Sequence, residues 1–151
     1  KLALCRKLGA DHTINYKTES FRERVAVLTD NRGVNVILDF VGAPYWDDNL
    51  ASLAHGGRLL LIGFLGGSGG NLSIAAIMSK RLTVTGTTLR RTPLEEKTRL
   101  THGFMQSGLN RLANGNIHPV IDKIFPIENA TAAHAYMHAN TNIGKIILTI
   151  D

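Results

Sequence analysis

The sequence lacks the features that mark a membrane protein, a disulfide-stabilised protein or a structural metal site. Its apolar runs are shorter than the roughly eighteen residues that a membrane-spanning helix needs, and its first residues show no basic, apolar and small-residue signal. The single cysteine, Cys5, cannot form a disulfide within the chain, and no Cys/His set has the spacing of a structural zinc site. These absences favour a protein of a reducing, cytoplasmic compartment with no membrane-spanning segment and no metal.

Acidic residues are also in the minority. The 151 residues include 12 acidic side chains against 17 lysines and arginines, for a formal net charge of +5. Such a charge can indicate nucleic-acid binding when it forms a continuous basic surface. Here the basic residues form separate pairs among acidic ones and no basic arm is present: Arg6-Lys7, Lys80-Arg81 and Arg90-Arg91. A polyphosphate cofactor explains the charge with fewer assumptions, so we expect no nucleic-acid partner.

The residues that are present predict alternating helices and strands. Helical patterns cover residues up to 8 and about 20–29, 44–54, 74–81, 92–113 and 129–139, and strand patterns cover 12–16, 34–41, 58–64, 82–88, 119–126 and 144–150. Ser20 with Glu23 has the form of a capping box, while Thr92, Pro93 and Glu95 predict an N-cap, a first-turn proline and a second capping box. The central strands are unbroken apolar runs. This pattern predicts an α/β fold with a parallel sheet that carries helices on both faces.

The ends of the predicted strands are the places where a ligand is expected. In an open parallel sheet, ligands bind beyond the carboxyl ends of the strands. The segments at these positions are Tyr16, 40–42, 63–65 and 87–89. We therefore expect these segments to lie near a bound ligand.

The glycine-rich loop at 63–70 follows a strand and precedes a helix, as a dinucleotide-binding loop does. It does not fit G-x-G-x-x-G in any register, and no acidic residue follows about twenty positions later. The loop is therefore either a flexible linker or a strand-end loop that a ligand approaches closely. Its place at the carboxyl edge of the sheet favours the second interpretation.

Several other polar residues have a functional and a structural interpretation. Asp39, at the end of a buried strand, is either a ribose-binding or catalytic acid or a carboxylate bonded to backbone amides, and the second is favoured because no acid–base partner is near in the sequence. His134 and His138 are four residues apart on a predicted helix, but no third metal ligand accompanies them. Ser68 lies in G-G-S-G-G rather than G-x-S-x-G, which argues against a hydrolase.

Six segments together resemble one family. They are LGADHTINY, GVNVILDFVGAPYW, GGRLLLIGFLGG, SKRLTVTGTTLR, PVIDKIFPIENATAAHAYM and NIGKIIL, in this order. In this combination they resemble the zinc-independent, zeta-crystallin-like quinone oxidoreductases of the medium-chain dehydrogenase/reductase superfamily. The chain starts within a helical pattern, and the resemblance implies that a GroES-like domain and the first two strands of the cofactor domain precede it. It also implies a partial Rossmann-type, doubly wound sheet in residues 1–115 and a segment returning to the catalytic domain in 116–151.

The resemblance implies a set of cofactor-binding positions and an NADPH cofactor. It places Tyr16 beside the adenosine ribose and its 2′-phosphate, and Asn140 where some relatives have a basic residue near the phosphate. Residues 40–42 would pack on the cofactor, 62–65 would lie beside the nicotinamide ribose, and 87–89 would lie near the carboxamide. The residues in these ranges are Phe40, Val41, Gly42, Ile62, Gly63, Phe64, Leu65, Thr87, Thr88 and Leu89.

The activity implied is NADPH-dependent hydride transfer to quinones or related electron-poor carbonyls. The protein would act mainly by positioning the cofactor and the substrate. No catalytic side chain is assigned within the 151 residues. An enoyl or alkenal reductase on the same scaffold, and a non-catalytic structural or RNA-binding family member, are the alternatives.

The strand predicted at 82–88 carries an expectation about assembly. In the family's sheet it is the outermost strand, and its sequence is β-branched, uncharged and free of proline. These are the properties of an edge that pairs with another strand. We expect a homodimer through residues 82–88. The alternative is that the helix starting at Pro93, or the loop before it, covers this edge.

Overall fold

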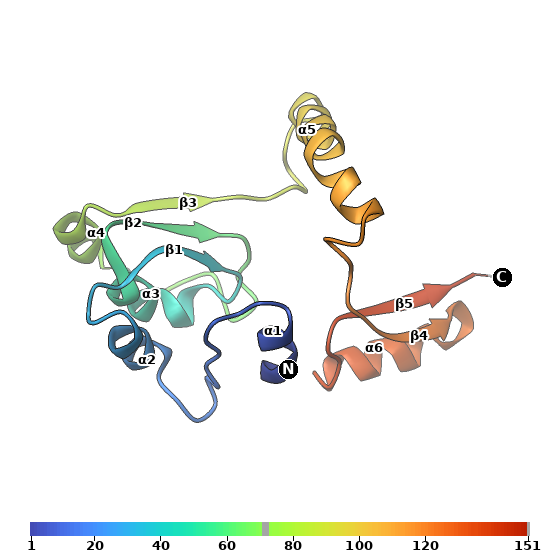
Figure 1. Ribbon diagram of the computed structural model, residues 1–151, viewed down its shortest axis with the longest axis horizontal. Helices are drawn as coiled ribbons and strands as arrows, with labels where there is room; N and C mark the ends of the chain where they lie inside the picture. Colours follow the sequence, from blue (N-terminus) through green and yellow to red (C-terminus); the bar gives the residue numbers. More distant parts are fainter. Residues whose placement is uncertain (71–72, 151) are drawn as a thin grey trace. The chain divides into compact units, whose positions relative to one another are not determined.

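The computed structural model describes residues 1–70 and 73–150. The described chain forms two compact units, residues 2–92 and residues 93–150 with Lys1 (Figure 1). The division precedes the long helix, whereas the sequence predicted a functional boundary after residue 115, and that boundary stays a prediction. Within the described residues, no helix is long and apolar enough to cross a membrane.

The first unit contains a three-stranded parallel sheet. Its helices are α1 (Leu2–Lys7), α2 (Phe21–Leu28), the 3-10 turn η1 (Ala43–Tyr45), α3 (Trp46–Ser52) and α4 (Ile74–Lys80). Its strands are β1 (Val34–Asp39), β2 (Leu53–Leu61) and β3 (Thr83–Gly86), in the order β1-β2-β3. The parallel α/β architecture predicted from the apolar strand runs is confirmed.

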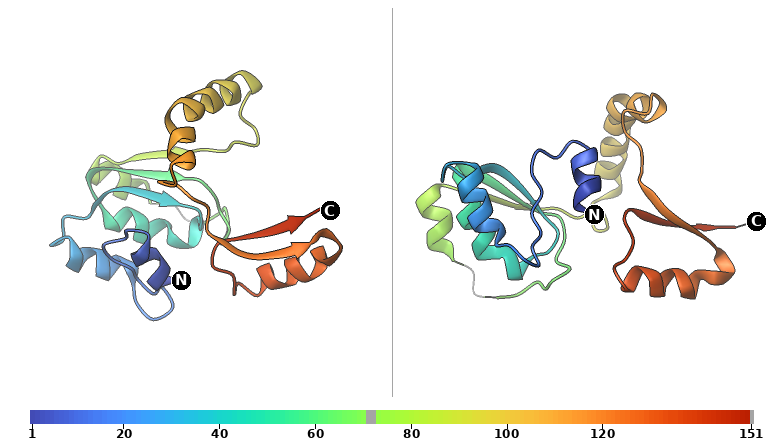
Figure 2. Two further views of the ribbon diagram at one scale, coloured as in Figure 1. Left: turned by 45° about the vertical axis from the view of Figure 1, so that its right-hand side comes forward. Right: turned by 60° about the horizontal axis from the view of Figure 1, so that its bottom comes forward.

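The helices α2, α3 and α4 form one layer on the sheet of this unit. α3 and α4 pack on β2, and α2 packs on α3 (Figures 1 and 2). The chain steps in the same direction from β1 to β2 to β3, and successive right-handed crossovers in one direction place their helices on the same side. The second layer of helices that the sequence pattern predicted is not seen among the described residues of this unit.

The core therefore lies between one face of the sheet and its helices. It is formed by the buried side chains Trp46, Leu50, Leu53, Leu59 and Leu82. Along β1 the opposite face is open, and Leu38 keeps 61% of its surface exposed. The prediction that residues 34–41 are buried on both faces is wrong for this chain, because helices cover only one face.

The connection from α3 to β2 differs from the sequence prediction. The helix ends at Ser52, and β2 begins at once at Leu53, whereas a strand over 58–64 was expected. The strand ends at Leu61. β1 advances from Val34 to Val36 while β2 advances from Leu53 to Arg58, so residues 54–57 bulge out of the ladder. Gly56 and Gly57 lie in this bulge.

Two further local predictions are wrong and one is confirmed. Residues 12–16 form no strand, since the described chain gives them no ladder partner. Pro93 is the N-cap of α5 rather than its first helical residue, and Thr92 Oγ1 donates to the carbonyl of Thr88 instead of capping the helix. The Ser20 cap is confirmed, because its Oγ accepts from the amide of Glu23 at 3.3 Å.

The second unit holds one long helix and a small sheet. α5 (Leu94–Ala113) is followed by β4 (Ile121–Pro126), the 3-10 turn η2 (Ile127–Asn129), α6 (Ala130–His138) and β5 (Lys145–Thr149). β4 and β5 pair in parallel, and α6 packs on both. This β-α-β unit confirms the elements predicted for residues 119–150.

Candidate cofactor-binding site at the strand ends

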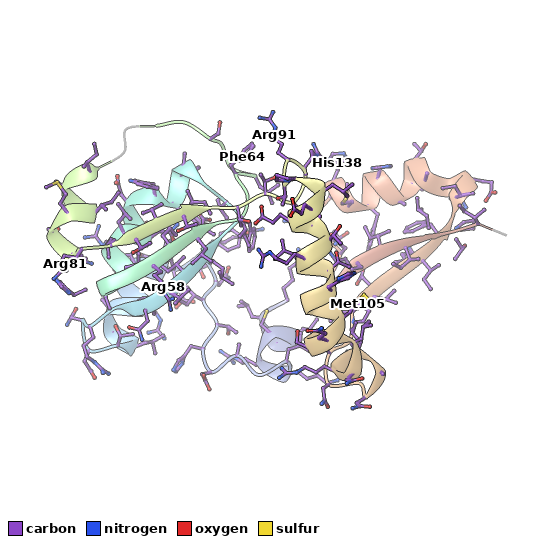
Figure 3. All side chains as sticks on the ribbon, turned by 90° about the horizontal axis from the view of Figure 1, so that it is seen from above. Arg58, Phe64, Arg81, Arg91, Met105 and His138 are labelled. Carbon is purple, nitrogen blue, oxygen red and sulfur yellow. The ribbon has the colours of Figure 1, made fainter. Side chains whose placement is uncertain are left out.

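Three of the predicted segments meet at the carboxyl edge of the first sheet. Residues 40–42, 62–65 and 87–89 directly follow β1, β2 and β3. The amide of Ile62 donates to the carbonyl of Asp39 at 2.7 Å, and the amide of Thr87 donates to the carbonyl of Leu61 at 3.0 Å. The three strand ends therefore lie side by side. Figure 3 shows Phe64 at this edge and Arg81 at the opposite end of the sheet.

The turn after β1 and the glycine-rich loop after β2 are bonded to each other. The amides of Leu65 and Gly66 donate to the carbonyls of Phe40 and Val41 at 3.0 and 2.8 Å, and the amide of Ala43 donates to the carbonyl of Gly67 at 3.0 Å. Residues 40–43 and 65–67 thus form one hydrogen-bonded assembly. Of the two interpretations left by the sequence, a flexible linker does not describe residues 65–67.

Gly42 has no room for a side chain. Its φ of 92° and ψ of −139° lie where residues other than glycine are strained. A Cβ at this position would stand 2.6 Å from the carbonyl oxygen of Gly67 and 2.9 Å from the Cα of Phe64. Glycine is therefore required by the close approach of the two segments, whatever binds there.

Asp39 is bonded to the backbone of this turn, as the favoured interpretation predicted. The residue is buried, with 4% of its surface exposed. Its carboxylate accepts from the amides of Val41 and Gly42 and from the side-chain amide of Asn49. The bonds to the turn thus occupy the Asp39 carboxylate, which is nearly buried and touches only the wall of the hollow beside β1.

Large apolar side chains are exposed at this edge. Phe40 and Phe64 keep 56% and 68% of their surface exposed, and Leu65 and Leu89 are also exposed. Exposed apolar groups that gather in one place are typical of a binding surface. Flat rings and leucines of this kind suit an aromatic or ribose-containing ligand better than a small ion.

Two hollows contain most of the predicted residues, whereas Gly42, Leu65 and Leu89 line neither. One, of about 390 Å³, lies at the ends of β2 and β3 and is lined by Ile62, Gly63, Phe64, Thr87 and Thr88 together with Leu61 and Gly86. The other, of about 280 Å³, lies beside β1 and includes Tyr16, Phe40 and Val41 in a mostly apolar wall to which Asp39 and Asn49 also belong. Asn140 follows α6 in the second unit, and its role stays a prediction.

Asn49 is the residue that sequence reasoning missed. It lies in α3 three residues after Trp46 and next to Leu50, two residues of the buried core, so a polar side chain stands in the apolar stripe of the helix. A polar residue at such a position needs a hydrogen-bond partner. That spacing was the available signal, and the partner is Asp39, at 3.1 Å.

The comparison with known proteins places the chain in a family. Residues 8–148 match the model of a family described as zinc-binding dehydrogenase. The chain is 28% identical to quinone oxidoreductase-like protein 2 of Bos taurus, over 99% of this chain and 43% of that protein. It is 30% identical to 2-haloacrylate reductase of a Burkholderia species, over 98% of this chain and 44% of that protein.

The fold is similar to part of larger solved structures. An NAD-dependent alcohol dehydrogenase superposes on 100% of this chain with a TM-score of 0.81 and 29% identity, and the match covers 41% of that enzyme. The chain thus spans less than half the length of these proteins. The likeness over nearly the whole chain confirms the resemblance that the sequence segments indicated.

The family's name implies zinc, and the described residues can be tested for a site. No three His, Cys, Asp or Glu side chains gather in the part of the chain that the structure describes. These residues do not fit a zinc ion. A nicotinamide cofactor, which the family also implies, fits better the apolar surface at the strand ends. The chain belongs to the zinc-binding dehydrogenase family of the medium-chain dehydrogenase/reductase superfamily.

Proposed function

We propose that the chain is the carboxyl-terminal part of an NADPH-dependent reductase that transfers a hydride to quinones or related electron-poor carbonyls. The observation that carries the proposal is the surface at the ends of β1, β2 and β3, where exposed apolar side chains border two hollows. The likeness to a bovine protein named as quinone oxidoreductase-like supports the choice of substrate class.

In this proposal the chain's residues act by positioning. The bound cofactor supplies the hydride. Ile62, Gly63 and Phe64 hold its nicotinamide ribose, and the Thr87 and Thr88 backbone and hydroxyls orient the carboxamide. The rings of Phe40 and Phe64 exclude water beside it. Correct alignment of donor and acceptor can supply much of the rate enhancement of such a transfer.

A steady-state assay of the complete protein tests the activity. NADPH and NADH are each offered with an ortho- and a para-quinone, and cofactor oxidation is followed by absorbance. We expect turnover, with a higher kcat/KM for NADPH. The absence of oxidation with both cofactors would contradict the proposed function.

The choice between the two cofactors depends on Tyr16. Its ring is 61% exposed and belongs to the hollow beside β1. A structural relative is named as NAD-dependent, so the preference needs its own measurement. If the Tyr16 hydroxyl contacts the 2′-phosphate, Tyr16→Phe raises the KM for NADPH several-fold and leaves that for NADH unchanged. Tyr45→Phe, in the same hollow, is the matched control and changes neither.

A second candidate is reduction of an activated carbon–carbon double bond. It is favoured by the identity to an enzyme named as a haloacrylate reductase, whose substrate is an electron-poor alkene. The same positioning surface serves both reactions, because each receives a hydride from the cofactor. A panel of quinones, enones and acrylates, compared by kcat/KM, separates the two candidates.

A further inference from the structure

The Asp39 carboxylate has an arrangement of partners that only an acceptor satisfies. Oδ1 accepts from the amide of Val41 at 2.7 Å and from that of Gly42 at 3.2 Å. Oδ2 accepts from the same Gly42 amide at 3.2 Å and from Nδ2 of Asn49 at 3.1 Å. Every partner is a donor. An asparagine or a protonated carboxyl group at this position would therefore set one donor against another.

The turn at residues 40–43, which this carboxylate binds, is also hydrogen-bonded to the loop at 65–67. Gly42 has a conformation that few residues adopt, and such a conformation persists only where its surroundings determine it. Asp39 and Asn49 lie beneath the turn, and the loop at 65–67 is bonded to its carbonyls and to Ala43. A change at Asp39 therefore reaches the 65–67 loop through backbone hydrogen bonds.

We propose that Asp39, held in place by Asn49, is a positioning residue that sets the backbone of 40–42 and 63–67 for cofactor binding. This inference rests on the proposed function. Asp39 and Asn49 are each 4% exposed and belong to the wall of the hollow beside β1, so the pair acts mainly through the backbone that it holds. Its effect is on the placement of Phe40 and Phe64, whose exposed rings are carried by the two segments that the pair holds.

Exchanging the two side chains gives a sharp test. Asp39→Asn puts the donor Nδ2 where an oxygen accepted from the amide of Gly42 and from Asn49, and Asn49→Asp sets two carboxylates together. The double variant D39N/N49D restores a donor–acceptor pair while leaving an acceptor for Val41 and Gly42. In the complete protein, titration of NADPH fluorescence should show a Kd raised about tenfold to a hundredfold in each single variant, the range for loss of a hydrogen bond to a charged group. The double variant should recover at least part of the loss.

The control variant is at Thr29, which ends α2 and precedes β1. Thr29 Oγ1 donates to the carbonyl of Val25 at 2.7 Å and accepts from the amide of Gly33 at 2.9 Å, so Thr29→Val also removes side-chain bonds to the backbone. It should lower the melting temperature and leave the Kd unchanged. Kd is measured at a temperature where circular dichroism shows all variants folded.

The outcomes separate the two proposals. If the wild-type protein binds NADPH and Asp39→Asn changes only the melting temperature, as Thr29→Val does, the positioning role is wrong and the proposed function stands. If the wild-type protein binds neither NADPH nor NADH, the proposed function fails and the inference fails with it. A variant too unstable to assay leaves Asn49→Asp and the double variant, where failure of the exchange to restore any affinity contradicts the pairing.

Discussion

At the scale of single residues, Gly42 shows how little space separates the turn from the loop. An alanine there meets both a strained φ and a carbonyl oxygen at 2.6 Å. Gly67 also has a positive φ, 128°, but nothing lies within 4 Å of a Cβ built on it. Gly67→Ala should therefore cost about 1–2 kcal/mol of unfolding free energy from strain alone, and Gly42→Ala about 3 kcal/mol or more. Chemical denaturation of both variants measures the difference, and equal losses would show that the close approach has no energetic effect.

Tyr136 gives a pH dependence to the second unit. Its hydroxyl donates to the carboxylate of Asp122 at 2.8 Å, and this hydrogen bond, with burial, raises the pKa of Tyr136 above 10.0. The folded state then keeps a proton that the unfolded chain has lost. The stabilisation is fully present below pH 10.0 and disappears as the pH rises through the folded pKa.

The expected result is a stability difference between the wild-type protein and Tyr136→Phe that is constant near neutral pH and shrinks at alkaline pH. Ultraviolet absorbance should also show one late-titrating tyrosine that the variant lacks. A difference that grows with pH would have the wrong sign and would contradict this role of the Asp122 bond.

At the scale of elements, Lys80 of α4 donates hydrogen bonds to the carbonyl groups at the end of α3. Lys80 Nζ donates to the carbonyls of Leu50, Ala51 and Leu53 at 3.1, 2.7 and 2.8 Å, where α3 ends. The last carbonyls of a helix have no partner within it. Burial, with the charge of Arg22, lowers the pKa of Lys80, and the three bonds offset the cost of burying its ammonium.

Lys80→Met should therefore lower the unfolding free energy by about 2 kcal/mol, because it leaves three carbonyls at the end of α3 without their donor. Lys17→Met, at an exposed position, is the control and should change it little. Denaturant titration measures both. Equal stability of the two variants would mean that water replaces the ammonium without loss.

The order of the elements was predictable from the sequence, because apolar runs and capping residues are local signals. The errors occurred where structure depends on a partner. Residues 12–16 have strand character, but a strand exists only where a ladder partner is present. The bulge at 54–57 depends on pairing with β1, which no local signal reports.

The candidate site divides in the same way. The rule that ligands bind at the carboxyl ends of parallel strands selected 40–42, 63–65 and 87–89, which lie at one edge of the sheet, and their role in binding stays a prediction. It did not reveal the bonds between 40–43 and 65–67, because these join residues more than twenty positions apart. The partner of Asp39 is only ten positions away, and it was missed because the polar Asn49 in the apolar stripe of α3 was not recognised as a signal.

At the scale of the whole molecule, β3 is an edge strand of its sheet. The amide of Thr87 points toward β2, so by alternation along the strand the amide of Val84 points toward the open edge. We propose that a second copy of the protein pairs there and extends the sheet across a two-fold axis.

Val84→Pro removes the outward amide and should convert the dimer to a monomer. Val84→Ala loses similar side-chain packing but keeps the amide, and it should stay dimeric. Light scattering after size-exclusion chromatography gives the mass of each. A wild-type protein that is monomeric at high micromolar concentration would exclude the dimer.

The bulge at residues 54–57 separates the start of β2, where the register shifts, from the part of β2 that pairs regularly with β1. Despite the extra residues, β1 and β2 pair one to one from Arg58 onward. The number of residues in the bulge therefore does not set the position of the strand ends. We therefore expect insertions or deletions at 54–57 to leave the direction of the strands at the candidate site unchanged. The same place offers a site for a genetically inserted tag or fluorophore.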